Sequence, residues 1–373
     1  MLNVFPRGRV IPSDDVIGRH GFVHELEERL FLGDSAMLAG PRRIGKTSVA
    51  FDVLWKLRDR GCYTIDIDLF HIPTSEELGL QIMRKVLQVR TGLLRTATHT
   101  IKGFLEFISK AEIAIKLQDL EITSRLGEVS DNPIALLDEA FLIAERIAEN
   151  DNRRLIILFD EFQEIERIGG EILLKRLRSI FQHQQYVSYL FLGSEPSMMR
   201  TIFADRRQAF YRFATMLHLP DIGSDEWEEY VLRKLNQANL TMSGIAFDVL
   251  MQDTGGHPYC VMTVLFDVFL LSQIEHKTQI DSELIKNSLI RAFGQLEAIY
   301  DELWKRTLEI RGADEVLLAL AEGTPPYRTN ESVVVKRAIN KLMDTSILKK
   351  IERGHYEFVE PMFKTWILNK VGN

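Results

Sequence analysis

The segment Gly40-Pro41-Arg42-Arg43-Ile44-Gly45-Lys46-Thr47 has the residue types and the spacing of a loop that surrounds phosphate groups. Its glycines allow a sharp turn and a close approach of backbone N–H groups to phosphate oxygens. The Lys46 ammonium is expected to reach the β and γ oxygens, and the Thr47 hydroxyl to bind Mg²⁺. With Ser48 added, this segment supplies most of the candidate nucleotide-binding residues. The alternative is an ordinary turn between a strand and a helix.

A second chemical group follows about 110 residues later, where the apolar run 155–159 ends in Asp160-Glu161. A carboxylate at the end of a buried strand, facing a phosphate loop, is suited to holding Mg²⁺, so Asp160 is the candidate metal ligand beside Thr47. Glu161 is then placed to polarise an attacking water as general base. The alternative is an acidic pair that caps the following helix, where negative charge is favourable.

These groups need a parallel sheet to position them. Residues 35–39 are predicted to form a strand before the glycine loop and residues 48–60 a helix after it, so that the helix N-terminus receives the phosphate charge. Further strands are predicted at 63–70, 155–159, 189–193 and 214–219, separated by helical segments. The expected fold is therefore α/β, a parallel sheet with helices on both faces.

The pattern changes twice along the chain. Residues 1–221 are predicted to form the core, with inserted helices and a hairpin at about 92–133. Residues 222–307 carry helical periodicity throughout and predict an all-α domain. Residues 308–373 predict two helices followed by two short strands, which is the layout of a winged helix-turn-helix.

Composition limits the class of protein. With 373 residues, 46% hydrophobic residues and a net charge of −7, the chain predicts a multidomain globular protein without a general basic field for nucleic acid. Cys62 and Cys260 match no metal spacing and are expected in the core of a reduced, cytoplasmic protein. No apolar signal-peptide core is present, and the apolar stretch 260–271 is too short to span a membrane.

Together, residues 40–47 and 155–161 resemble the Walker A and Walker B segments of P-loop NTPases. The whole chain resembles the AAA+-like archaeal and bacterial ATPases, close to the STAND and origin-recognition ATPases. This resemblance implies a P-loop NTPase core, an all-α lid domain and a winged-helix domain. It also implies a slow, Mg²⁺-dependent ATPase, with ATP and Mg²⁺ as cofactors.

Two weaker matches to this family lie in the core. Ile17-Gly18-Arg19 precedes the first helix and resembles the segment that covers the adenine base; the alternative is a plain turn before a helix. Ser194 follows the predicted fourth strand and resembles the sensor residue that contacts the γ-phosphate or the attacking water; the alternative is a simple turn.

Two further matches concern the nucleotide's other contacts. His257-Pro258 resembles the family's lid motif, in which a helix directs its positive end toward the nucleotide; the alternative is a satisfied structural histidine. Arg212, directly before the last predicted strand, best matches the arginine that stabilises charge on the transferred phosphoryl group. The alternative is a solvated charge at a helix end. Whether Arg212 acts in its own subunit or on a neighbour stays open.

The favoured function is a nucleotide-dependent switch that binds and hydrolyses ATP and acts on a partner protein or on DNA. The alternative is a nucleotide-stabilised DNA-binding or adaptor protein in which hydrolysis is incidental. Glu161 favours the first, because binding alone requires no base. Six basic residues of the predicted winged helix could neutralise DNA phosphates: Lys336, Arg337, Lys341, Lys349, Lys350 and Arg353. The alternative, implied by the resemblance to STAND ATPases, is a regulatory or partner-docking module that folds back on the nucleotide domain. A homo-oligomer and a separate effector chain are further expected partners; no membrane contact is expected.

Overall fold

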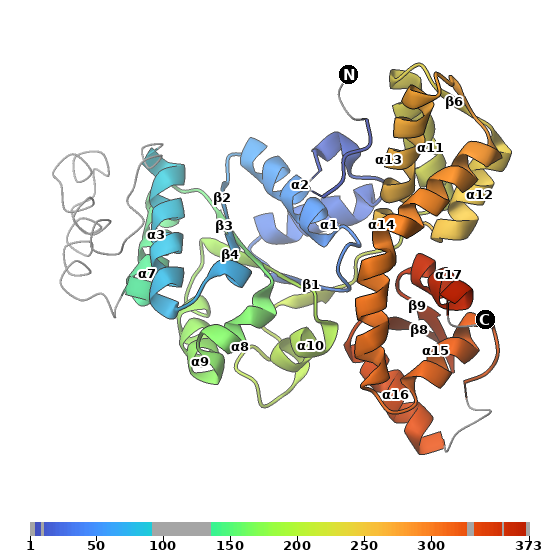
Figure 1. Ribbon diagram of the computed structural model, residues 1–373. Coiled ribbons are helices and arrows are strands. Elements are labelled where there is room, and N and C mark those ends of the chain that lie inside the picture. Colours follow the sequence, from blue (N-terminus) through green and yellow to red (C-terminus); the bar gives the residue numbers. More distant parts are fainter. Residues whose placement is uncertain (1–3, 9–10, 92–135, 327–331, 353, 371–373) are drawn as a thin grey trace. The chain divides into compact units, whose positions relative to one another are not determined.

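The computed structural model describes residues 4–8, 11–91, 136–326, 332–352 and 354–370 (Figure 1). The insertion predicted at about 92–133, and Arg353, lie outside these residues. The chain divides into two compact units. The sheet unit comprises residues 20–40 and 49–219, and the helical unit comprises residues 1–19, 41–48 and 220–373.

The sheet unit is built on five strands that all run parallel, in the order β2-β3-β4-β1-β5. The strands are β1 (Ala36–Ala39), β2 (Tyr63–Asp68), β3 (Leu155–Asp160), β4 (Val187–Gly193) and β5 (Thr215–Leu217). The predicted parallel α/β sheet is therefore confirmed. Its apolar runs were the strongest signal, because strands covered on both faces need apolar residues at successive positions.

Alternate residues of the central strands face opposite sides of this sheet. The register places Ile157 opposite Tyr189 and Phe159 opposite Phe191 on one face. The Phe159 ring stacks on both Tyr189 and Phe191 there, and this face forms one apolar cluster with α3, α7 and α9. On the other face, the Ser188 hydroxyl donates to the Leu30 carbonyl near the end of α1.

Helices cover both faces of the sheet, as predicted. Figure 1 shows α1 and α2 on one side and α8, α9 and α10 on the other. The helices of this region are α1 (His20–Phe31), α2 (Lys46–Asp59), α3 (Ser75–Thr91), α7 (Leu136–Asn150), α8 (Ile165–Ile168), α9 (Gly170–Phe181) and α10 (Pro196–Ala204).

One strand ends earlier than its sequence predicts. The strand expected at 63–70 stops at Asp68, and a 3₁₀ turn (Leu69–His71) follows. The cause is local, since the Asp68 carboxylate accepts the Phe70 N–H at 3.0 Å and closes the turn.

The helical unit begins with α11 (Ser224–Gln237), α12 (Gly244–Thr254), α13 (Pro258–Ile274) and α14 (Ser282–Leu308). The expectation of an all-α domain needs one correction, because β6 (Thr241–Met242) and β7 (Gln279–Ile280) pair in parallel. Each short strand leads directly into a helix N-cap, Ser243 for α12 and Asp281 for α14, so the pairing brings two helix starts together.

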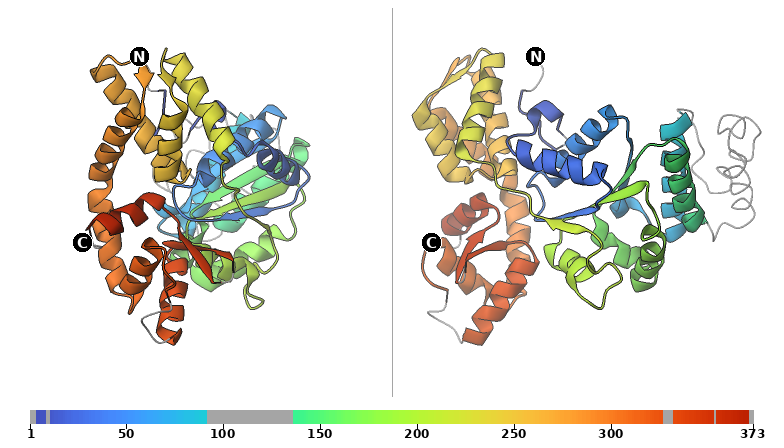
Figure 2. Two further views of the ribbon diagram at one scale, coloured as in Figure 1. Left: turned by 90° about the vertical axis from the view of Figure 1, so that its right-hand side faces the viewer. Right: turned by 180° about the vertical axis from the view of Figure 1, so that it is seen from behind.

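The C-terminal part contains α15 (Ala313–Ala321), α16 (Ser332–Asp344), antiparallel β8 (Leu348–Glu352) and β9 (His355–Phe358), and α17 (Pro361–Lys370). Two helices and a hairpin occur in the predicted order, and α17 is an addition. Figure 2 shows α14 as one long helix reaching this part. A single apolar core, which includes residues from Phe5 to Ile367, joins it to the preceding helices. The boundaries at 221 and 307, and the winged helix, stay predictions.

Candidate functional site

The phosphate loop follows β1, and α2 begins at Lys46. Gly45 has φ +96°, a conformation that residues with a Cβ rarely adopt, so the glycine is required for the turn into the helix. Lys46 is 7% exposed, and its Nζ donates to the Pro41 carbonyl at 2.6 Å. The ammonium is thus directed across its own loop, where an arriving phosphate could replace the carbonyl as acceptor.

Arg19 connects the segment 17–19 to this loop. Its Nη1 donates to the Ile44 carbonyl at 2.9 Å, and its Nε donates to the Pro220 carbonyl at 2.7 Å. Burial lowers the pKa of Arg19 to about 10, so the guanidinium stays charged near neutral pH. The predicted adenine segment therefore touches the phosphate loop, while its contact with a base stays a prediction.

His257 is the buried polar group that most clearly lacks a partner. It is 7% exposed at the N-cap of α13, and neither ring nitrogen has a hydrogen-bond partner within the described residues. Burial, followed by the positive charges of Arg43 and Lys349, lowers its pKa to about 4. The choice between a structural histidine and the lid motif therefore stays open, although no described protein group satisfies its ring nitrogens. Unpaired buried nitrogens beside cations fit a polar, anionic ligand such as a nucleotide phosphate.

This histidine predicts a specific pH dependence of stability. The pKa of His257 is depressed in the folded chain, so its contribution is present above pH 6.5 and is lost as the pH falls toward 4. We expect the free energy of unfolding to fall by about 2 kcal/mol more between about pH 7 and pH 5 in the parent than in His257→Asn. Urea unfolding of both proteins at the two pH values measures this. Equal losses in both would contradict it.

Arg43 of the phosphate loop contacts residues elsewhere in the helical unit. Its guanidinium lies 4.3 Å from the centre of the Tyr259 ring and 3.7 Å from the Glu360 carboxylate. Glu360 in turn accepts from the Tyr300 hydroxyl at 3.3 Å, and burial raises the pKa of this carboxyl. Sequence reasoning treated Arg43 only as a loop residue, because its partners are more than 200 positions away.

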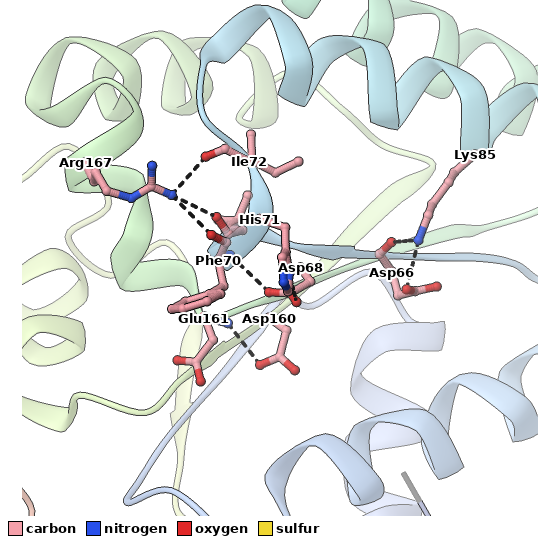
Figure 3. A network of polar contacts seen from close by, with 10 residues as sticks. Asp66, Asp68, Phe70, His71, Ile72, Lys85, Asp160, Glu161 and Arg167 are labelled. Carbon is pink, nitrogen blue, oxygen red and sulfur yellow. Dashed lines mark hydrogen bonds and ion pairs between the residues drawn. The ribbon is translucent and has the colours of Figure 1, made fainter. Parts of the chain in front are cut away.

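In the sheet unit, Asp160 and Glu161 lie at the carboxyl end of β3 (Figure 3). Glu161 has φ +52°, and its N–H donates to Asp160 Oδ1 at 2.9 Å. Its Oε2 accepts from the Ser194 hydroxyl at 2.6 Å and from Gln163 Nε2 at 2.5 Å. The structure thus brings the predicted base and the predicted sensor into direct contact, and it adds Gln163, which sequence reasoning missed.

The start of the loop lies at the same edge. The Gly40 N–H donates to the Gly193 carbonyl at 3.2 Å, directly before Ser194. Because all five strands are parallel, this edge holds the carboxyl ends of β1, β3 and β4 together. Ligands of open α/β sheets bind outside this edge.

The turn after β2 is fixed at this edge as well. Asp68 is the register partner of Asp160, and its carboxylate contacts His71 Nδ1 at 2.9 Å. Arg167 of α8 donates to three carbonyls of this turn, the closest being Ile72 at 2.9 Å (Figure 3). The segment after Glu161 is thereby held against the end of β2.

Arg212 does not lie at the carboxyl edge of the sheet. It precedes β5, whose first residue Thr215 pairs with the first residue of β1, so it lies at the amino edge of the sheet. There it lines a cavity of about 420 Å³ with Asp34 and Thr215, and its guanidinium lies 5.1 Å from the Tyr211 ring. β4 has seven residues, so the two edges are roughly 20 Å apart. Arg212 and Glu161 are therefore not brought together within one chain.

The predicted Mg²⁺ site has only two protein ligands, Thr47 and Asp160. Within the described residues, no group of three or more His, Cys, Asp or Glu side chains could hold a metal. Thr47 and Asp160 belong to different compact units, so the Mg²⁺ site that they share stays a prediction. By type, a hydroxyl and a carboxylate suit Mg²⁺ in sites where substrate phosphates and water supply the remaining ligands. In the same part of the chain, no helix is both long and apolar enough to cross a bilayer.

No protein-family model and no curated protein matches the chain. Several solved structures resemble the chain. A Walker-type ATPase of Pyrococcus abyssi has 19% identity and a TM-score of 0.68, over 97% of this chain and 99% of that one. The ORC2 protein of Aeropyrum pernix, in ADPNP–ADP complexes, has 14% identity and a TM-score of 0.57, over 100% and 98%. The ORC1 protein of Aeropyrum pernix, in complex with DNA, has 14% identity and a TM-score of 0.50, over 99% and 96%. Along its length the chain therefore has the P-loop α/β fold with a C-terminal helical region.

Proposed function

We propose that this protein binds ATP with Mg²⁺ and hydrolyses it slowly, as an AAA+/STAND-like switch for a partner protein or DNA. The observation that carries the proposal is the Glu161 carboxylate, held by Ser194 at the carboxyl edge where Gly40 begins the phosphate loop. The likeness in fold to a Walker-type ATPase and to an ORC2 protein solved in ADPNP–ADP complexes adds support.

Each predicted residue has a defined task in this proposal. Lys46 and the loop N–H groups hold the phosphates, and His257 at the start of α13 supplies a further polar contact. Thr47 and Asp160 hold Mg²⁺, which neutralises phosphate charge when bound. Glu161 accepts a proton from the attacking water, with its carboxylate oriented by Ser194.

Arg212 is proposed to act on a neighbouring copy. Arg212 lies at the amino edge, roughly 20 Å from the carboxyl edge of its own sheet, which is farther than one arginine side chain spans. Its exposed guanidinium is available to a second copy's γ-phosphate. The proposed active form is therefore a homo-oligomer.

The switch part of the proposal rests on Arg43. This arginine belongs to the phosphate loop and contacts Tyr259 on α13 and Glu360 before α17. A bound phosphate would compete with Glu360 for the guanidinium. The occupancy of the loop would then bias the packing of α13 and α17, through the difference in affinity between the two arrangements.

Small-angle scattering with ADP and with a non-hydrolysable ATP analogue tests the switch. We expect a change in the radius of gyration or in the mass between the two nucleotides, and no change in Lys46→Ala, which lacks the phosphate contact. Identical profiles and masses in the parent protein would remove the switch. The nucleotide-stabilised adaptor would then be the better account, and exposed Lys336, Arg337 and Lys341 on α16 would favour DNA as its partner.

A further inference from the structure

Gln163 is a buried amide beside the proposed catalytic base. It lies in the 3₁₀ turn Phe162–Glu164 and is 3% exposed. Its Nε2 is 2.5 Å from Glu161 Oε2 and 3.3 Å from Ser194 Oγ. Since Ser194 Oγ is itself 2.6 Å from the same Oε2, the three side chains form a closed triangle of hydrogen bonds.

The chemistry of these groups determines which atom donates. A carboxylate only accepts, and the single hydroxyl proton of Ser194 goes to Glu161, so the Ser194 oxygen is left to accept. Only the NH₂ side of Gln163 can therefore face both partners. Two donors then converge on Oε2 of Glu161, and the other carboxylate oxygen, Oε1, receives neither of them.

The remaining end of the amide shows that packing does not explain this residue. Gln163 Oε1 is buried without a hydrogen-bond partner in the described part of the chain. It faces Gly193, where an added Cβ would lie 3.0 Å from this oxygen and 2.3 Å from Met199 Cγ. A leucine would fill the same space without leaving an unpaired carbonyl. The amide is thus retained for its NH₂ contacts with Glu161 and Ser194.

The backbone of Glu161 points to the same conclusion. A φ of +52° is uncommon for a residue with a side chain, and such conformations persist where surrounding contacts hold them. Asp160 holds the Glu161 N–H, and Gln163 holds its carboxylate. Both ends of the residue are fixed before any ligand binds.

We propose that Gln163 is a positioning residue for ATP hydrolysis, which fixes Glu161 Oε2 so that Oε1 is the oxygen that takes the proton of water. This rests on the proposed function. The water proton passes to Oε1, the water oxygen bonds to the γ-phosphorus, and the bond from that phosphorus to the β,γ-bridging oxygen breaks. Gln163 touches neither water nor nucleotide and acts only through Glu161.

The test compares three variants of the full-length protein by steady-state ATP hydrolysis and by calorimetry of ATP binding. Gln163→Leu keeps the volume and removes the donor. We expect kcat to fall by about 10- to 100-fold, because a misdirected base loses much of its catalytic contribution. The dissociation constant for ATP should stay within about twofold, since the amide makes no contact with the phosphate loop.

Gln163→Glu provides a readout that a purely structural amide would not change. A carboxyl at this position can donate to Glu161 only when protonated, and two carboxylates at this distance share a proton. We expect kcat of this variant to decrease as the pH rises from about 5.5 to 8, relative to the parent. If Gln163→Leu does not fold, the pH dependence of kcat in Gln163→Glu still tests the proposal.

Gln184→Leu is the matched control. Gln184 is a half-buried amide of the same unit that donates to the Phe141 carbonyl and accepts from the Tyr189 hydroxyl, directly before β4 at the amino edge. Its loss should lower stability and leave kcat unchanged. If the parent hydrolyses ATP, Gln163→Leu matches Gln184→Leu in kcat and Gln163→Glu keeps the pH profile of the parent, the positioning inference alone is overturned. If the parent neither binds nor hydrolyses ATP, the proposed function is overturned with it.

Discussion

Replacing Lys46 by alanine is expected to weaken ATP binding by about 100-fold, the largest binding effect of any single change in the chain. The Lys46 ammonium is directed across the phosphate loop, at 2.6 Å from the Pro41 carbonyl. A charge-assisted hydrogen bond to phosphate contributes roughly 3 kcal/mol, which corresponds to two orders of magnitude in the dissociation constant. Isothermal calorimetry with ATP and Mg²⁺ measures the change directly.

Two comparisons make this prediction specific. Lys175→Ala removes an exposed lysine of α9 whose only described ion pair is with exposed Glu171, and it should bind ATP like the parent. Thermal unfolding without nucleotide shows whether Lys46→Ala is folded, because the change also removes a contact within the loop. If folded Lys46→Ala binds ATP as tightly as the parent, the phosphate-loop assignment is wrong.

The sequence was most informative where one physical cause dominates. The apolar runs of β3 and β4 predicted their strands because both faces of a parallel sheet are buried. Pro258 predicted the start of α13, because proline suits the first helical position. Because the apolar run of β3 ends at Asp160, the sequence also predicted that Asp160 and Glu161 lie at the edge of the sheet.

The direction of the strands, and not their order, decides where Arg212 lies. Its sequence position, directly before a strand, was identified correctly as lying before β5. In a parallel sheet a residue before a strand lies at the amino edge, whereas the phosphate loop follows a strand at the carboxyl edge. These two facts together are enough to separate Arg212 from Glu161 by sequence reasoning alone.

Long-range side-chain pairs were beyond sequence reasoning. Gln163 meets Ser194, 31 residues away, and Arg43 meets Glu360, 317 residues away. Neither pair leaves a periodic or spacing signal, because each depends on how separate elements pack. The sequence shows only a polar residue between Phe162 and Ile165, and the burial of Gln163 is visible in the structure alone.

Glu161→Gln is expected to keep ATP binding and to slow hydrolysis at least 100-fold. The amide has the shape of the carboxylate, so its carbonyl oxygen can still accept from Ser194 Oγ and Gln163 Nε2. The other end is then an NH₂ group, which donates and cannot take a proton from water. If the new amide were turned round, its NH₂ group would face the NH₂ group of Gln163, and neither could accept a hydrogen bond. The neighbouring side chains therefore favour the orientation in which the NH₂ group takes the place of Oε1, and this orientation cannot accept the water proton.

Phosphate release in a single turnover, with ATP bound at saturation, isolates this chemical step from binding. Glu166→Gln is the matched control, because it makes the same substitution at an exposed glutamate of α8 and should hydrolyse ATP at the parent rate. The slow Glu161→Gln protein should also retain the scattering profile of the ATP analogue when given ATP, since the nucleotide stays intact. Unchanged phosphate release in Glu161→Gln would place the base elsewhere. The triangle of Glu161, Ser194 and Gln163 would then be a structural feature of the sheet edge.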